Sequence, residues 1–327
     1  MENHKRTRAL ARWLLLLLCM FAGIAQADRA KQWSVVELGA FNPQQGSASF
    51  GVNNRGDAVG RSFIGCCAFQ HAFFWRNGTM LDINPPGNLN SRAWAVNNNG
   101  TAVIEGDSNR IYTWRDGEFT LLPFAGFPND INNGGAVTGG WLSGTGTHAF
   151  IYKDGVLTDL GTLGGQFSAG NAVNNDGVVV GGAAPSGFSP VHAFAYMDGA
   201  MRDLGTLGGA ASTATDVNDD GVVVGRSQDA SGQLVAFAWD AAQGMRTLPV
   251  PGANNAVSIN NRGDIVGTSS HGSFLLSDGA VTMLDAIAAV KAGGYSLVVP
   301  DDINERGWIA GTARIANRTV AILLIPQ

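Results

Sequence analysis

The stretch Asp198–Gly225, DGAMRDLGTLGGAASTATDVNDDGVVVG, decides the fold, because it nearly repeats Asp154–Gly181, DGVLTDLGTLGGQFSAGNAVNNDGVVVG, which begins 44 residues earlier. Both copies end in an Asn, two further residues, a Gly and a β-branched run that closes on another Gly. Self-similarity with a period of about 40 residues indicates that one supersecondary unit is stacked many times. The architecture can therefore be predicted before any single residue is considered as a site.

The Asn-x-x-Gly step of this repeat occurs seven times. Its asparagines are Asn53, Asn97, Asn132, Asn174, Asn218, Asn260 and Asn304, at intervals of 44, 35, 42, 44, 42 and 44 residues. In the most regular units a first strand ends at the Asn, a second is the β-branched run, a third carries the pattern His-Ala-Phe, and a fourth follows an Asp-Gly or Asn-Gly hairpin turn. Four short antiparallel strands per unit, repeated radially, predict an all-β propeller with seven blades.

The two ends of the chain predict how the ring closes. The seventh unit has strands at Asp302–Asn304, Trp308–Gly311 and Val320–Ile325 but no fourth strand, whereas WSVVELG at Trp33–Gly39 matches the fourth-strand pattern. An N-terminal strand that completes the last blade would hide two sheet edges that otherwise promote aggregation. We therefore predict a single seven-bladed β-propeller of four-stranded antiparallel blades, with its last blade closed by the N-terminal strand.

Residues 1–27 have the pattern of a secretory signal peptide. A basic start precedes the apolar run Trp13–Ile24, and Ala25-Gln26-Ala27 is a small-x-small cleavage site. The apolar run is too short to span a bilayer, and Leu18 stands before Cys19 where a lipoprotein signal needs a small residue. We expect export to the periplasm or the cell exterior, with residues 28–327 forming the propeller and no membrane span in the mature chain.

Composition excludes some partners. The net charge is −5 and only 14% of residues are charged, which is not the electrostatic footprint of a protein that binds nucleic acid. The mature chain keeps only the adjacent Cys66 and Cys67, whose Cα atoms lie about 3.8 Å apart, closer than a relaxed disulfide prefers. A strained vicinal disulfide, an intermolecular bond and two free thiols all stay open. We expect a monomer stabilised by its repeated core.

Two short motifs resemble a known family. HAF at His71, His148 and His192, together with DLGTLGG at Asp159 and Asp203, is similar to the HAF-type extracellular repeat family of bacteria, over essentially the whole mature chain. The resemblance implies export and a repeat-built β fold, and it implies no established catalytic residue. Units two, five, six and seven depart from the family pattern because they lack the histidine.

The candidate metal and catalytic residues have structural explanations. In the other units the histidine is replaced by Arg110, Val235, Gly272 and Val320, so we interpret it as a packing or hydrogen-bonding position at a strand start. Asp216–Gly221 begins like a calcium loop, but Ser227 stands where a bidentate glutamate is required. No nucleophile elbow, zinc motif or phosphate loop is present. The sequence predicts no metal site, no cofactor and no catalytic residue.

Because successive strands are antiparallel, their connections alternate between the two faces of the ring. The tight Asn-x-x-Gly and Asp-Gly turns fall on one face, and long, dissimilar connections fall on the other, where binding sites are usually carried. These connections include Phe124–Pro128, Trp141–Thr147 and the insertion Leu284–Pro300, which contains the single helix that the sequence predicts. Aromatic residues that break the repeat on this face are the candidate binding residues: Phe124, Phe127, Trp141, Tyr295 and Trp94, the last on a first strand.

These features predict an exported, non-catalytic binding or scaffold protein. Aromatic rings on a rigid rim suit stacking on a glycan or anchoring another exported protein, although each ring could instead cover the apolar top of its own blade. One alternative is a secreted carbohydrate-active enzyme of the glycosidase or lyase type that uses channel acids such as Asp130, Asp216 and Asp302. The other is a cell-surface structural protein.

Overall fold

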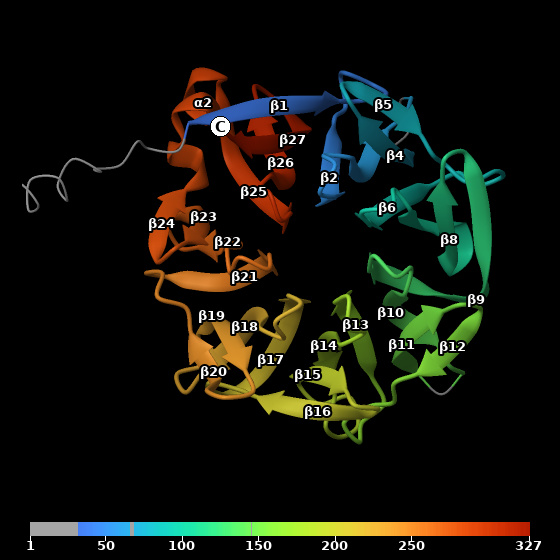
Figure 1. The fold of residues 1–327 in the computed structure, drawn as a ribbon, viewed down its shortest axis with the longest axis vertical. Helices are drawn as coiled ribbons and strands as arrows, with labels where there is room; N and C mark the ends of the chain where they lie inside the picture. Colours follow the sequence, from blue (N-terminus) through green and yellow to red (C-terminus); the bar gives the residue numbers. More distant parts are fainter. Residues whose placement is uncertain (1–31, 66–68, 145) are drawn as a thin grey trace, which may run out of the picture.

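The computed structural model describes residues 32–65, 69–144 and 146–327, which surround a central channel (Figure 1). The predicted signal peptide and the Cys66–Cys67 pair lie outside the described residues. Blades 1 to 3 comprise β2 (Ser47–Val52), β3 (Ala58–Phe63), β4 (Gln70–Arg76), β5 (Thr79–Asp82), β6 (Ser91–Val96), β7 (Ala102–Gly106), β8 (Arg110–Arg115), β9 (Glu118–Ile131), β10 (Val137–Leu142), β11 (Thr147–Lys153) and β12 (Val156–Asp159). A 3₁₀ turn at Asp107–Asn109 joins β7 to β8.

The remaining blades follow in chain order around the ring. Blades 4 and 5 comprise β13 (Ser168–Val173), β14 (Val179–Ala183), β15 (His192–Met197), β16 (Ala200–Gly205), β17 (Gly208–Val217), β18 (Val223–Asp229), β19 (Leu234–Asp240) and β20 (Gly244–Thr247). Blades 6 and 7 comprise β21 (Ala253–Ile259), β22 (Ile265–Ser269), β23 (Gly272–Ser277), β24 (Ala280–Met283), β25 (Tyr295–Ile303), β26 (Ile309–Ile315), β27 (Arg318–Pro326) and β1 (Trp33–Gly39). The innermost strand of each blade lines the channel. The predicted seven-bladed propeller is confirmed.

One strand belongs to two blades. The described residues form five four-stranded sheets and one seven-stranded sheet, in which β9 pairs with β8 through its first half and with β10 through its second. The predicted connection Phe124–Pro128 is therefore wrong, because these residues lie inside a continuous strand. The physical reason is length: the interval from Asn97 to Asn132 is 35 residues, which leaves no residues for a separate loop between blades 2 and 3.

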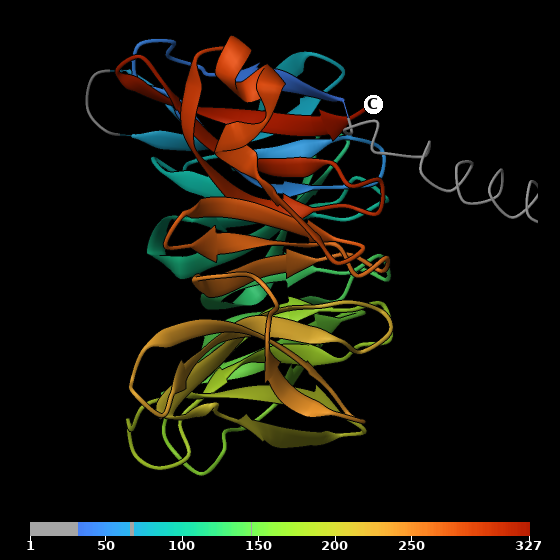
Figure 2. The same ribbon diagram turned by 90° about the vertical axis from the view of Figure 1, so that its left-hand side faces the viewer.

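The N-terminal strand closes the ring as predicted. β1 pairs antiparallel with β27, from Trp33 opposite Pro326 to Gly39 opposite Ala321. The insertion after β24 forms a 3₁₀ turn at Leu284–Ala286 and the short helix α2 (Ala288–Ala292), which lies beside β1 (Figure 2). In the described part of the chain, no helix is long and apolar enough to cross a membrane.

The phenylalanine of the HAF pattern builds the core between strands. Phe73, Phe150, Phe194, Phe237 and Phe274 are fully buried, and each pairs across the sheet with the glycine that ends the β-branched run of its unit. At Gly181, an added Cβ would collide with the carbonyl oxygen of Ala169 and with the ring of Phe194. Glycine is therefore required at this position, because the neighbouring strand and the phenylalanine ring approach the backbone too closely for a side chain.

Candidate functional site

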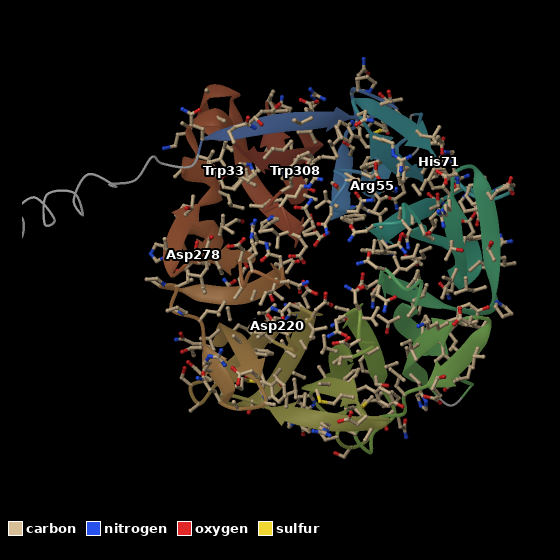
Figure 3. All side chains as sticks on the ribbon, viewed as in Figure 1. Trp33, Arg55, His71, Asp220, Asp278 and Trp308 are labelled. Atoms are coloured by element: carbon tan, nitrogen blue, oxygen red, sulfur yellow. The ribbon has the colours of Figure 1, made fainter. Side chains whose placement is uncertain are left out.

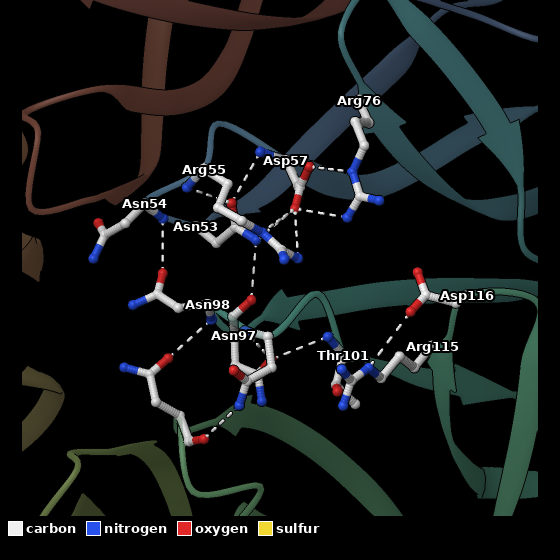
Figure 4. Close-up of polar contacts among 12 residues, drawn as sticks. Asn53, Asn54, Arg55, Asp57, Arg76, Asn97, Asn98, Thr101, Arg115 and Asp116 are labelled. Atoms are coloured by element: carbon white, nitrogen blue, oxygen red, sulfur yellow. Dashed lines mark hydrogen bonds and ion pairs between the residues drawn. The ribbon is translucent and has the colours of Figure 1, made fainter.

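Seven asparagine side chains form a closed ring at one end of the channel. The Nδ2 of each turn asparagine donates to the backbone carbonyl of the turn asparagine in the next blade, over 2.8–3.3 Å. The last of these bonds runs from Asn304 back to Asn53, and Figure 4 shows the bond from Asn53 to Asn97. Each Oδ1 also accepts the backbone N–H four residues further on. The repeated asparagine is thus a structural residue.

A second ring lies next to the first. The residue after each turn asparagine donates its backbone N–H to the side-chain oxygen of the equivalent residue in the next blade, over 2.8–3.0 Å. Its members are Asn54, Asn98, Asn133, Asn175, Asp219, Asn261 and Glu305. We call this end of the channel the Asn-turn opening. It leads into a hollow of about 160 Å³, whose polar rim side chains are used to join the blades.

Three carboxyl groups face the middle of the channel. Asp130, Asp216 and Asp302 each stand two residues before a turn asparagine, and each accepts the backbone N–H of the next blade's first strand, from Val173, Ile259 and Val52 respectively, over 2.8–2.9 Å. Ser258 Oγ bonds both Asp216 and Asp302. All four of these side chains line the hollows that open at both ends of the channel.

Burial makes these carboxyl groups easy to protonate. Burial, together with the negative charges of Asp216 and Asp130, raises the pKa of Asp302 to about 7. Burial also raises the pKa of Asp130 to about 6 and raises that of Asp216. Nevertheless, among the residues that the structure describes, no three His, Cys, Asp or Glu side chains are grouped so that they could hold a metal ion.

The opposite end of the channel, which we call the channel mouth, differs from blade to blade. Its ring consists of the residues three before each turn asparagine: Phe50, Trp94, Asn129, Asn171, Thr215, Val257 and Asp301, around a hollow of about 120 Å³. In blades 3 to 5 the side chains of Asn129, Asn171 and Thr215 each donate to a carbonyl oxygen of the next blade over 2.7 Å. This half of the mouth joins blades, as the Asn-turn opening does.

The other half of the channel mouth carries an aromatic and charged cluster. The rings of Phe50 and Trp94 are stacked with centroids 5.0 Å apart, and the Arg61 guanidinium lies 5.7 Å from the Phe50 ring centre. Trp94 Nε1 donates to Glu105 over 3.0 Å. Burial raises the pKa of Asp301 to about 7, although the charge of Arg61 opposes this shift.

A polar hollow of about 360 Å³ adjoins this cluster on blades 1 and 2. Its lining includes Gln70, Asn90, Arg92, Glu105 and Asp107. Gln70 accepts a hydrogen bond from Arg61 over 2.8 Å, and Glu105 is the carboxylate that holds Trp94. The mouth and the hollow therefore form one surface with an aromatic pair at its inner end and amide, carboxylate and guanidinium groups along it.

The five predicted binding residues do not form one site. Trp94, Phe124 and Trp141 pack against the same core cluster between blades 2 and 3, and Phe124 contacts the rings of Phe150 and Tyr152. Phe127 is 39% exposed, but it lies within strand β9 and not in a loop. Of these residues only Trp94 lies at the channel mouth, on its first strand as expected.

Trp141 and Tyr295 lie in strands, which corrects their predicted loop positions. Trp141 pairs with His148 and Gly126 within its sheet, and its buried Nε1 has no hydrogen-bond partner in the described part of the chain. Tyr295 begins β25, and its hydroxyl donates to Glu37 of β1 over 3.3 Å. Both are partly buried against the core, because the strands extend further than the repeat pattern indicates.

Sequence reasoning missed Phe50, Arg61 and Glu105. Phe50 could have been found, because it stands three residues before Asn53 as Trp94 stands three before Asn97. Arg61 and Glu105 lie on second strands, β3 and β7, and nothing in their spacing indicates that they reach the channel mouth.

Each histidine of the three HAF motifs pairs with an aspartate on the fourth strand of its own blade, and in two blades this aspartate begins a DLG motif. His71 Nδ1 lies 2.7 Å from Asp82, His148 lies 2.9 Å from Asp159, and His192 lies 2.8 Å from Asp203. Each pair joins the third and fourth strands of its blade, far from the channel, as the position of His71 illustrates (Figure 3). The histidines are therefore in separate blades and do not converge on a shared site.

Comparison with known proteins shows the fold. No family model and no curated protein matches the chain. Among solved structures it is similar to YCF48 bound to a D1 peptide, with TM-score 0.55, 13% identity, and coverage of 92% of this chain and 98% of that one. It is also similar to TolB from Acinetobacter baumannii (TM-score 0.50, 12% identity, 72% and 61% coverage) and to an extracellular domain from B. thetaiotaomicron (0.55, 14%, 89% and 39%).

Proposed function

We propose that this chain is an exported, non-catalytic binding protein that holds a glycan at its channel mouth. The observation that carries the proposal is the Phe50–Trp94 stack at the channel mouth. Arg61, Glu105 and Asp301 flank this stack, which replaces the polar residues that join blades 3 to 5 on the other half of the mouth. Export is supported by the predicted signal peptide. The resemblance to the HAF-type extracellular repeat family remains part of the proposal, and the His–Asp pairs would account for its two motifs.

The chemistry of the mouth favours a sugar. An aromatic ring presents an apolar face to the C–H groups of a pyranose, and binding pockets fix orientation with a few placed polar groups. Here Gln70, Arg92 and Glu105 line a hollow beside the stack, and they offer the donors and acceptors that hydroxyl groups require. A peptide is the competing ligand, since YCF48 has the same fold and was solved with a D1 peptide bound.

The test is a binding screen of the folded chain against soluble oligosaccharides and a peptide array, followed by calorimetry on the hits. We expect an oligosaccharide hit whose affinity falls more than tenfold in Trp94→Ala and in Glu105→Gln. Phe127→Ala is the matched control, because that ring is exposed but lies away from the mouth, and it should bind like the wild type. Peptide hits alone, or unchanged affinity in both mouth variants, would contradict the proposal.

A second function is favoured by one observation. Asp130 and Asp302 have pKa values raised to about 6 and about 7, which is the range in which a carboxyl group can act as a general acid near neutral pH. A carbohydrate-active enzyme would then turn over a polysaccharide or glycoside, and Asp302→Asn would abolish that turnover. Against this, the backbone N–H bonds to both carboxyl groups give them a structural use in joining blades.

A further inference from the structure

On the Asn-turn face, the turn glycine of a blade faces the preceding blade across a slot at several blade boundaries. One wall carries the residue four positions after a turn asparagine, and the other carries the turn glycine of the next blade. Between blades 7 and 1 the indole of Trp308 occupies this slot, so that a Cβ added to Gly56 would collide with the ring. Trp308 packs there on the core that blades 7 and 1 share (Figure 3).

Arginine side chains fill two further slots. The Arg55 guanidinium lies against Gly100 between blades 1 and 2, and the Arg262 guanidinium lies against Gly307 between blades 6 and 7. Each arginine pairs with the buried carboxylate four positions after the turn asparagine, Asp57 or Asp264. These slots are thus completed by the chain's own bulky side chains.

The slot between blades 5 and 6 has no such side chain, and a Cβ added to the turn glycines Gly135, Gly177 or Gly221 would likewise meet nothing within 4 Å. Val222 stands at the position that Trp308 occupies in blade 7, and a Cβ at Gly263 would meet nothing within 4 Å. A hollow of about 380 Å³ remains there. Its apolar walls are Val222, Ala238, Leu248, Ile259, Ile265 and Leu276.

The rim of this hollow has one uncompensated charge. Arg246 is paired with Asp240 at 2.6 Å, and Arg262 is paired with Asp264. Asp220 also lines the rim, and within the described ranges no ion pair neutralises its carboxylate; Figure 3 marks its position beside the channel. A cationic group beside an apolar ring would therefore complement this slot.

We propose that the blade 5–6 slot is an anchor site for an aromatic side chain of a partner polypeptide, with a basic residue next to that aromatic residue. The chain itself fills the equivalent slot of blades 7 and 1 with an indole, so the shape suits a planar ring. A ring buried in a preformed pocket is the usual anchor of a protein interface. This inference is independent of the glycan proposed at the channel mouth.

The direct probes are short blocked peptides added to the ¹⁵N- and methyl-labelled protein and followed by NMR. Acetyl-Trp-Lys-amide should shift the methyl signals of Val222, Ile265 and Leu276 in a saturable manner. Acetyl-Ala-Lys-amide, which lacks the ring, should leave them unchanged. Acetyl-Trp-Glu-amide should bind several-fold more weakly, and Asp220→Asn should remove that difference.

A substitution copied from the chain tests the same idea. Val222→Trp places an indole where blade 7 has Trp308, so it should fill the slot and weaken acetyl-Trp-Lys-amide binding more than tenfold. Val178→Trp, at the equivalent position of blade 4, is the matched control and should keep wild-type binding. Trp94→Ala at the channel mouth should also keep it, which separates this site from the glycan proposal.

Two results would overturn the inference. One is equal shifts with acetyl-Trp-Lys-amide and acetyl-Ala-Lys-amide, or shifts that map away from the slot. The other is wild-type affinity in a Val222→Trp variant whose folding is verified by circular dichroism. Should Val222→Trp fail to fold, the methyl map of the wild-type protein decides the matter by itself.

Discussion

The two ends of the channel are built from the same seven strands but use their side chains differently. At the Asn-turn opening, two complete rings of hydrogen bonds pass through every blade. Among the described residues, the side chains of the mouth ring that bond the next blade belong to blades 3 to 5, and the first strands of blades 1 and 2 present an aromatic pair instead. Residues that obey the repeat hold the ring together, whereas residues that break it at the mouth form the aromatic and charged cluster of the proposed site.

The largest expected effect comes from a matched pair in blade 4. Asn174 is buried, donates to the carbonyl oxygen of Asn218 and accepts two backbone N–H groups. Asn174→Ala leaves these groups unsatisfied and should lower the free energy of unfolding by about 2–4 kcal/mol. Asn171→Ala at the mouth removes one bond, to Ala214, and should cost about 1 kcal/mol. Urea denaturation measures both free energies, and equal losses would show that the two ends of the channel contribute alike to stability.

Much of this architecture can be predicted from spacing alone. Seven Asn-x-x-Gly steps, a seventh unit without a fourth strand and a spare strand at Trp33–Gly39 predict the ring and its closure, since each depends on local turn chemistry and pattern. The channel mouth cannot be predicted in this way. Arg61 and Glu105 reach it through cross-strand register, and Trp141 and Tyr295 were misplaced because strands continue where the repeat pattern ends.

The channel carboxyl groups should make stability depend on pH. The pKa values of Asp130 and Asp302 are raised, to about 6 and about 7, so between pH 4 and pH 7 the folded state binds more protons than the unfolded state. The free energy of unfolding should therefore fall as the pH rises through this window, by on the order of 3–4 kcal/mol per group.

Asp302→Asn isolates one group, because an amide does not titrate there. The free energy of unfolding, measured by urea denaturation at pH 4.5 and at pH 8, should fall more for the wild type than for the variant. The prediction is contradicted if the wild type becomes more stable from pH 4.5 to pH 8 and the variant shows the same dependence of stability on pH. Burial in the channel would then not raise the pKa of Asp302.

A smaller effect tests whether the outer aromatic residues are structural. Tyr295 joins the insertion to the closing strand through Glu37, which also pairs with Arg318 at 2.9 Å. Tyr295→Phe keeps the ring and loses one partly exposed hydrogen bond, so unfolding should be easier by about 0.5 kcal/mol. Ligand binding should stay unchanged. A large loss of ligand affinity with unchanged stability would show instead that Tyr295 is a binding residue.

The most direct test compares one variant at each end of the channel by calorimetry with the oligosaccharide that binds the wild type. Trp94→Ala changes the channel mouth, and Asn98→Ala removes a side-chain acceptor from the second ring at the Asn-turn opening. We predict that Trp94→Ala loses more than tenfold in affinity, while Asn98→Ala lowers the melting temperature and binds normally. Normal binding by Trp94→Ala together with lost binding by a folded Asn98→Ala would contradict it.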